Sequence, residues 1–241
     1  MNNMSYIDFL AKFGISSAHP GGFSLTKKIL EPEEIEKHQR VLDVGCGTGK
    51  TSEYLAKQYK CQVSALDLHP LMLEKAKERF NKEQLDIELI QGDVQRLPFP
   101  DEQFDFIIAE SVTAFTEISL TLREYFRVLK KGGVLLDLEM TSNSSLSEYE
   151  KKDIRRIYGI TRVLTENEWI AALKDCGFKE ITGMKRENIQ APDHPPLELT
   201  DFNIGSLSFE ALKIWLDHLD MMKKYEQVLD YRVYRASKQG T

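Results

Sequence analysis

The sequence has few cysteines, and they form no pattern typical of a metal site or a disulfide framework. Only Cys46, Cys61 and Cys176 occur in the 241 residues. None of them belongs to a Cys-x-x-Cys pair or to a Cys/His ligand spacing, so we predict no metal site. We interpret all of them as small, buried apolar side chains of a protein in a reducing compartment.

Long apolar runs are also lacking. No stretch approaches the ~20 apolar residues that a membrane-spanning helix needs. Residues 1–10 include Asp8 and contain no basic segment followed by an apolar run, so they do not resemble a secretory signal peptide. These absences predict a cytoplasmic protein without a membrane anchor.

An excess of basic residues is missing as well. The chain has 32 Lys and Arg against 38 Asp and Glu, a net charge of −6, and no basic stripe. A net negative charge repels polyanions, so the composition disfavours a nucleic-acid partner.

Short β-branched runs alternate along the chain with amphipathic stretches. This alternation is typical of β-α-β units and predicts an α/β fold, a Rossmann-like doubly wound sheet. We expect strands at residues 40–44, 62–66, 86–91, 104–109, 134–138, 180–184 and 231–236. We expect helices at residues 50–59, 70–80, 122–129, 165–177 and 209–229, and a polar helix within 142–158.

The most informative segment is the glycine-rich run of residues 41–49, Val-Leu-Asp-Val-Gly-Cys-Gly-Thr-Gly. It follows a predicted strand and opens a helix, where glycines permit a tight turn and a close approach to a ligand. A dinucleotide site has the spacing G-x-G-x-x-G, and Lys50 stands in place of its third glycine, which argues against NAD or FAD. Asp43 suits a ligand with a cationic amino group. A generic tight turn is the alternative.

Acidic residues follow the predicted strands at their carboxyl ends. Asp67 closes the second strand, at a distance from the glycines where an acid typically accepts hydrogen bonds from both ribose hydroxyls. Asp93 follows the third strand and Glu110 the fourth. Because the carboxyl ends of parallel strands meet at one sheet edge, we expect these acids to converge on one ligand, with Leu68 and Val94 on either side of an adenine. For Asp67 alone, a helix cap is the alternative.

These segments together resemble a known family. The likeness rests on residues 41–49, 67–76, 92–106, 127–134 and 165–178. In order and spacing they are similar to the motifs of the class I S-adenosylmethionine-dependent methyltransferases, in the small-molecule branch that includes type 11 enzymes and the ubiquinone and menaquinone C-methyltransferases. The resemblance extends over roughly residues 38–184, whereas residues 185–229 match no segment of the family.

The resemblance implies the strand order 3-2-1-4-5-7-6, with the last strand antiparallel. It also implies S-adenosylmethionine as cofactor and S-adenosylhomocysteine as product. The cofactor-binding residues that it implies are Asp43 and Glu110 near the methionine end, Gly45, Cys46 and Gly47 in the loop, Asp67 at the ribose, and Leu68, Asp93 and Val94 at the adenine.

We expect one methyltransferase domain over residues 1–241, with a helical lid in residues 1–35 and an inserted lid in residues 140–160. Residues 36–140 would form the cofactor-binding half, and residues 141–241 the substrate-side half.

Residues for the methyl acceptor are less clearly marked. His19, in a His-Pro-Gly-Gly turn, is a candidate base or orienting group near the methyl, or simply part of a helix entry. Phe115, Tyr158 and Asp201 are candidate pocket residues. We expect His218 on a helix surface. The apolar stripe around Trp215 is expected to pack on its own domain, with a partner surface as the alternative.

The predicted function is methyl transfer to a small-molecule acceptor, by a monomer or a homodimer. The fourth strand ends in Ala109-Glu-Ser-Val rather than the Asn/Asp-Pro-Pro-Tyr of enzymes that methylate adenine or glutamine amino groups, and no Pro-Cys nucleophile of cytosine C5 methylation occurs. Two alternatives stay open: a cofactor-binding regulatory or partner subunit without its own catalysis, and an RNA or protein methyltransferase.

Overall fold

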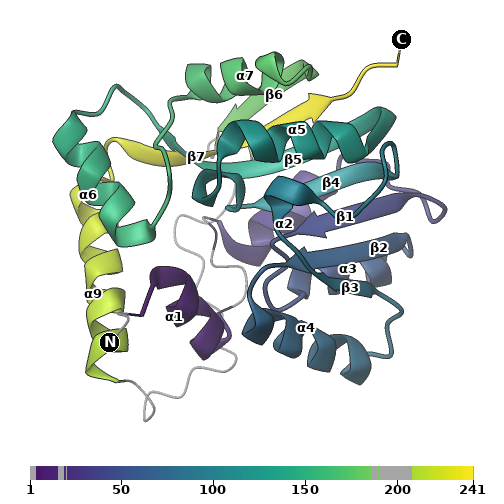
Figure 1. Ribbon diagram of the computed structural model, residues 1–241, viewed down its shortest axis with the longest axis horizontal. Helices are drawn as coiled ribbons and strands as arrows, with labels where there is room; N and C mark the ends of the chain where they lie inside the picture. Colours follow the sequence, from purple (N-terminus) through teal and green to yellow (C-terminus); the bar gives the residue numbers. More distant parts are fainter. Residues whose placement is uncertain (1–3, 16–18, 20, 186–188, 190–207, 241) are drawn as a thin grey trace.

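The computed structural model describes residues 4–15, 19, 21–185, 189 and 208–240. Its centre is a seven-stranded sheet with helices on both faces (Figure 1). The strands are β1 (Arg40–Val44), β2 (Gln62–Asp67), β3 (Glu88–Gln91), β4 (Phe104–Glu110), β5 (Leu129–Ser142), β6 (Lys179–Lys185) and β7 (Leu229–Ser237). Their order is β3-β2-β1-β4-β5-β7-β6, and β7 is antiparallel to both β5 and β6. The predicted fold class and strand order are confirmed.

Several of the helices begin at a residue whose side chain caps them. The helices are α1 (Tyr6–Phe13), α2 (Gly22–Leu30), α3 (Lys50–Gln58), α4 (Pro70–Lys82), α5 (Ile118–Val128), α6 (Glu148–Tyr158), α7 (Glu166–Asp175) and α9 (Phe209–Lys224), with short 3-10 turns η1 (Val94–Arg96) and η2 (Thr113–Phe115). Among the described residues, no side chain caps α2, α3 or α5. Ser5, Ser147 and Thr165 each form a capping box, and Pro70 occupies the first turn of α4.

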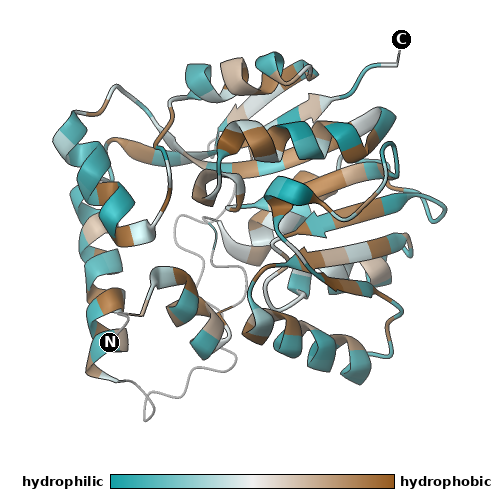
Figure 2. Cartoon of the chain, viewed as in Figure 1, coloured by the Kyte–Doolittle hydropathy of each residue, from teal (hydrophilic) through white to brown (hydrophobic). Residues whose placement is uncertain are grey.

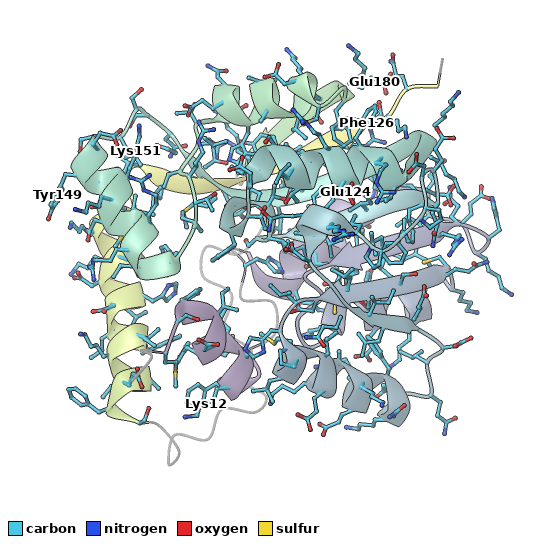
Figure 3. The ribbon with its side chains drawn as sticks, in the orientation of Figure 1. Lys12, Glu124, Phe126, Tyr149, Lys151 and Glu180 are labelled. Atoms are coloured by element: carbon cyan, nitrogen blue, oxygen red, sulfur yellow. The ribbon has the colours of Figure 1, made fainter. Side chains whose placement is uncertain are left out.

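Alternate residues of the central strands face two separate cores. In β1, Val41 packs with the core beneath α2 and α3, whereas Leu42 packs with the core beneath α5 and α7. Figure 2 shows the resulting concentration of hydrophobic residues on the strands. Figure 3 shows Phe126 on α5, which packs edge-on against Phe178 with ring centroids 5.2 Å apart. Both faces of the sheet are therefore covered, as a parallel sheet requires.

Three helices from distant parts of the chain, α1, α6 and α9, gather at one end of the sheet (Figure 1). Tyr6 stacks on His218, and Tyr6 and Tyr158 meet edge-on with centroids 5.2 Å apart. The Tyr158 hydroxyl lies 3.1 Å from Nδ1 of His218. The expectation of a surface His218 is therefore wrong, because α9 turns this side chain toward α1 and α6. We call these helices the cap.

The apolar stripe of α9 also differs from expectation. Its inward face carries Ala211 and Met221. Trp215 is partly buried against Phe9, whereas Leu212, Leu216, Leu219 and Met222 are exposed, Leu216 by 54%. The stripe does not pack as a unit on its own domain, because its leucines lie on the exposed side of α9.

Element bounds differ most from the prediction at two places. β5 is longer than the predicted 134–138: it begins at Leu129, which lies opposite Phe104 of β4, and β7 pairs with it from Val134 to Ser142, beyond the end of β4. α9 ends at Lys224, and β7 begins at Leu229 within the stretch expected to be helical. Cys46 and Cys61 are buried as expected, but Cys176 is partly exposed.

Asp201 and nearly all of residues 185–205 lie outside the described residues. Within the described ranges, no helix is both long and apolar enough to cross a membrane. The same ranges contain no cluster of three or more potential metal ligands.

Candidate cofactor and acceptor site

The strand register brings the predicted site residues to one edge. In the parallel pairing, Val44 of β1 lies opposite Leu66 of β2 and Ala109 of β4, and Asp67 lies opposite Gln91 of β3. The glycine loop, Asp67 and Glu110 therefore all follow the carboxyl ends of adjacent strands. In open α/β sheets this edge is where ligands bind.

The glycine loop has left-handed backbone at alternate residues, and its glycines serve different purposes. A Cβ on Gly45 would lie 2.3 Å from Cγ2 of Val112, and a Cβ on Gly49 would lie 2.6 Å from the Phe80 ring. These two glycines permit close packing inside the protein. Gly47 has φ +54°, and a Cβ there would meet no atom within 4 Å. The backbone at Gly47 is therefore the part of the loop that a ligand can approach.

Asp67 holds this loop from the end of β2. Its Oδ2 accepts the N–H of Gly47 at 2.8 Å, and its Oδ1 accepts the N–H of His69 at 2.8 Å. Burial raises the pKa of Asp67 above its ordinary value. The next residue, Leu68, is 64% exposed and leaves an apolar surface beside the carboxylate.

Asp43 is buried on β1, two residues before Gly45. Its side chain accepts a hydrogen bond from the Ser52 hydroxyl, and only 3% of the residue is exposed. Burial, and then the nearby charges of Glu110 and Asp67, raise the pKa of Asp43 to about 8. Burial also raises the pKa of the Cys46 thiol, so this cysteine is not a thiolate nucleophile at neutral pH.

Glu110 joins three elements at the end of β4. Its Oε1 accepts the Thr26 hydroxyl of α2 at 2.6 Å, and its Oε2 accepts the Thr51 hydroxyl of α3 at 2.7 Å. Nε2 of His19 lies 3.4 Å from Oε1, and His19 is only 8% exposed. The structure thus brings the predicted His19 and Glu110 together. The threonines were not predicted, although Thr51 lies only two residues after Gly49 of the glycine loop.

The remaining cofactor candidates lie after β3. Asp93 caps η1 by accepting the N–H of Gln95 at 2.9 Å, and the Gln95 side chain donates to both of its oxygens. Val94 is buried. Asp93 therefore has a structural role of its own, and contact with an adenine stays a prediction.

Two of the acceptor candidates, Phe115 and Tyr158, lie in or against one apolar core. Phe115 ends the turn η2 just after β4 and is partly buried against the core. Tyr158 is buried in the cap, where His218 and Tyr6 are its partners. Phe115 and Tyr158 thus contribute to the same apolar core, and their place in an acceptor pocket stays a prediction.

Sequence reasoning also missed a carboxyl pair on β5, Asp137 and Glu139, of which 0% and 1% are exposed. Thr113 and the backbone of the turn after β4 hydrogen-bond to them. The available signal was the alternation Leu-Asp-Leu-Glu in a strand expected to be buried.

Known proteins with similar sequences identify the family. A family model described as a methyltransferase domain matches residues 41–133. The uncharacterized methyltransferase YodH of Bacillus subtilis is 33% identical over 235 residues, which are 97% of this chain and 99% of YodH. The chain belongs to the class I S-adenosylmethionine-dependent methyltransferases. The malonyl-[acyl-carrier protein] O-methyltransferase of a Paenibacillus species is 28% identical, with 87% of this chain and 80% of that protein aligned.

Solved structures show the same methyltransferase fold. Phosphoethanolamine N-methyltransferase 2 of Haemonchus contortus, solved with S-adenosyl-L-methionine, superposes with a TM-score of 0.79 at 21% identity over 97% of this chain and 57% of that one. The [4+2]-cyclase SpnF also gives 0.79 at 21% identity, over 98% and 93%. Because one of these carries the name of a cyclase, the fold alone does not decide the reaction.

Proposed function

We propose that this methyltransferase transfers the methyl group of S-adenosylmethionine to a small-molecule acceptor at the edge formed by the glycine loop, Asp67 and Glu110. The observation that carries the proposal is the convergence of an approachable backbone at Gly47 with carboxylates from β1, β2 and β4. This donor set fits an adenosyl amino acid, which presents ribose hydroxyls and an ammonium group and carries no phosphate.

Each carboxylate has a role that follows from its place. Asp67 lies beside the loop with lone pairs left to accept the ribose hydroxyls, and the exposed Leu68 offers an apolar surface to the adenine. Val94 and Asp93 would bound the adenine on its other side. Asp43 and Glu110, together with the loop backbone, would hold the methionine end, where the ammonium neutralises part of their charge.

When bound, the cofactor supplies a methyl group on a sulfonium, a leaving group already activated by its charge. The protein then has to orient the acceptor and exclude water. His19 is placed for this task by Thr26, whose hydroxyl lies 3.3 Å from its Nε2, and by Glu110. For an acceptor that loses a proton, His19 would take it at a ring nitrogen, and Glu110 would stabilise the resulting imidazolium.

A small acceptor is favoured over RNA or protein by two observations. The chain has a net charge of −6, and the cap of α1, α6 and α9 stands at one end of the sheet. Relatives are named for sterol, phosphoethanolamine and fatty-acid methylation. The second candidate is a cofactor-binding partner subunit that catalyses no methyl transfer itself. It stays open because the same fold occurs in a protein named as a cyclase, so the fold does not by itself require methyl transfer.

The test is to incubate the protein with S-adenosylmethionine and separate fractions of dialysable metabolites, RNA and protein, and to measure S-adenosylhomocysteine release. We expect release with the metabolite fraction, and its loss in Asp67→Ala. Release with only RNA or protein would contradict a small acceptor. Tight cofactor binding without release from any fraction would favour the partner subunit.

A further inference from the structure

Two buried carboxyl groups on β5 are unexplained by the cofactor site. Asp137 and Glu139 have neighbouring positions on the same face of the strand and are fully buried. A buried pair of acids costs free energy unless the charge is reduced and hydrogen-bonded. Their partners therefore indicate what the pair does.

The Glu139 side chain accepts hydrogen bonds from the protein backbone. Its Oε1 accepts the N–H of Val112 at 2.9 Å and the N–H of Thr113 at 2.7 Å. The Thr113 hydroxyl lies 3.1 Å from both oxygens of Asp137. The pair thus forms hydrogen bonds with successive residues of the short turn that leads from β4 into η2.

This turn is strained where it leaves the cofactor site. Ser111, directly after Glu110, is a non-glycine residue with φ +59°. Left-handed backbone at such a residue costs free energy and persists only where the surroundings hold it. The N–H groups of the next two residues, Val112 and Thr113, are those bound by Glu139. On the other side, the Val112 side chain lies against Gly45 of the glycine loop.

No basic side chain among the described contacts neutralises the pair. Arg232 lies opposite Glu139 in the β5–β7 register, but its guanidinium donates to Glu166, Asp230 and Asn143. Tyr125 of α5 and Tyr234 of β7 are the other titratable groups nearby, and both are neutral, because burial raises their pKa values.

We infer that Asp137 and Glu139 form a positioning pair for the methyl-transfer site, in which Asp137 carries a proton and Glu139 directs its negative charge at the backbone of the turn after β4. Through these hydrogen bonds the pair fixes the position of the Glu110–Val112 segment against the glycine loop. The expected effect on cofactor binding rests on the proposed function, whereas the hydrogen bonds between the pair and the turn do not depend on it.

The division of roles follows from the partners. Burial raises the pKa values of both groups, but the backbone N–H groups counteract this at Glu139, whose pKa is about 7, whereas that of Asp137 lies well above its ordinary value. A protonated Asp137 can donate to Glu139, so one proton serves both acids.

Hydrogen-exchange mass spectrometry and calorimetric titration with S-adenosylhomocysteine test the pair on the full chain. Glu139→Gln removes the charge, and we expect exchange of the 112–113 amides to rise roughly 10- to 100-fold and the Kd to rise about tenfold. Asp137→Asn keeps an N–H donor toward Glu139, and both values should stay within about threefold of wild type. Glu33→Gln is the matched control, since Glu33 is a buried carboxylate bound to Arg235 away from this turn.

If Glu139→Gln fails to fold, Glu139→Asp provides the same test, because it keeps the charge but shortens its reach. Unchanged exchange and affinity in the Glu139 variant would overturn the inference. Faster exchange with unchanged affinity would reduce the pair to a structural role and overturn its link to the site. An Asp137→Asn variant as impaired as Glu139→Gln would contradict the proton assignment. If the wild type binds no S-adenosylhomocysteine, the proposed function fails. Hydrogen exchange of the 112–113 amides still tests whether the pair holds the turn.

Discussion

The Thr51 hydroxyl donates a hydrogen bond of 2.7 Å to Oε2 of Glu110, and so ties the first turn of α3 to the end of β4. Thr51 lies two residues after Gly49 of the glycine loop, and Glu110 is the last residue of the central strand β4. The Thr26 hydroxyl binds the other carboxylate oxygen from α2. One side chain thus fixes three elements around the position proposed for the methionine end of the cofactor.

Thr51→Val should lower the free energy of unfolding by roughly 1–3 kcal/mol, because a largely buried carboxylate oxygen loses its donor. Urea unfolding followed by circular dichroism measures this. Thr48→Val is the matched control. The Thr48 hydroxyl is buried and makes no hydrogen bond within the described part of the chain, so its removal should not lower stability. Equal effects in both variants would mean that the bond to Glu110 contributes nothing.

Gly47→Ala should impair cofactor binding more than stability. The new methyl group would stand in the open space at the loop, and the left-handed backbone adds a strain of about 1–2 kcal/mol. Gly132→Ala introduces the same kind of strain, at φ +81° and also without an atom within 4 Å of the Cβ, but at the edge of β5 away from the site. Titration should show weaker binding only for Gly47→Ala. Similar affinities in both variants would show that the ligand does not approach Gly47.

Asp43 makes cofactor binding depend on pH. Its pKa of about 8 means that the group is mostly protonated at neutral pH. A bound ammonium favours the carboxylate, so binding should release a proton, and affinity should rise with pH up to about 8. Calorimetry in two buffers of different ionisation enthalpy measures the released proton. Asp43→Asn should remove the difference between buffers, and a wild type without that difference would exclude Asp43 from the ammonium site.

The same shift has the opposite effect on the free protein. The folded-state pKa lies above the value of about 4 expected for an unfolded Asp, so the contribution of Asp43 to stability is present at low pH. That contribution is lost as the pH rises toward about 8. Saturating cofactor should offset this loss, which a thermal melt at several pH values can measure.

His19→Ala should lower turnover more than cofactor affinity, by roughly 100-fold or more in kcat if His19 takes the acceptor proton. His38→Ala is the control, because the His38 side chain is 77% exposed. Single-turnover assays with an active metabolite fraction, together with binding measurements, separate the two effects. Equal losses in kcat and in affinity would make His19 only a contact of the N-terminal segment.

Much of the fold was predictable from sequence because local signals agree with the global arrangement. The glycine loop, the acids at strand ends and the helix that begins after Thr165 all lie where expected. Strand order came from the family resemblance, since periodicity alone does not order strands. The division into a lid and two halves, and a cytoplasmic location, stay predictions.

What escaped prediction depends on partners far away in the chain. From the sequence, Glu139 is an unexplained acid in an apolar strand. Its role follows only from the structure, in which the N–H groups of residues 112–113 donate to it. His218 reads as a surface residue until α1 and α6 close over it. On α9, helical spacing revealed an apolar stripe, but the inward side is set by the neighbouring helices, and the leucines face outward.

The most direct test is calorimetric titration of the folded protein with S-adenosylhomocysteine, with Asp67→Ala and the exposed Asp86→Asn side by side. We predict saturable binding to the wild type and to Asp86→Asn, and a loss of roughly 1–3 kcal/mol in binding free energy for Asp67→Ala. Absence of binding heat and of any thermal shift in the wild type, or equal affinity in Asp67→Ala, would contradict a cofactor site at the glycine loop and the tip of β2.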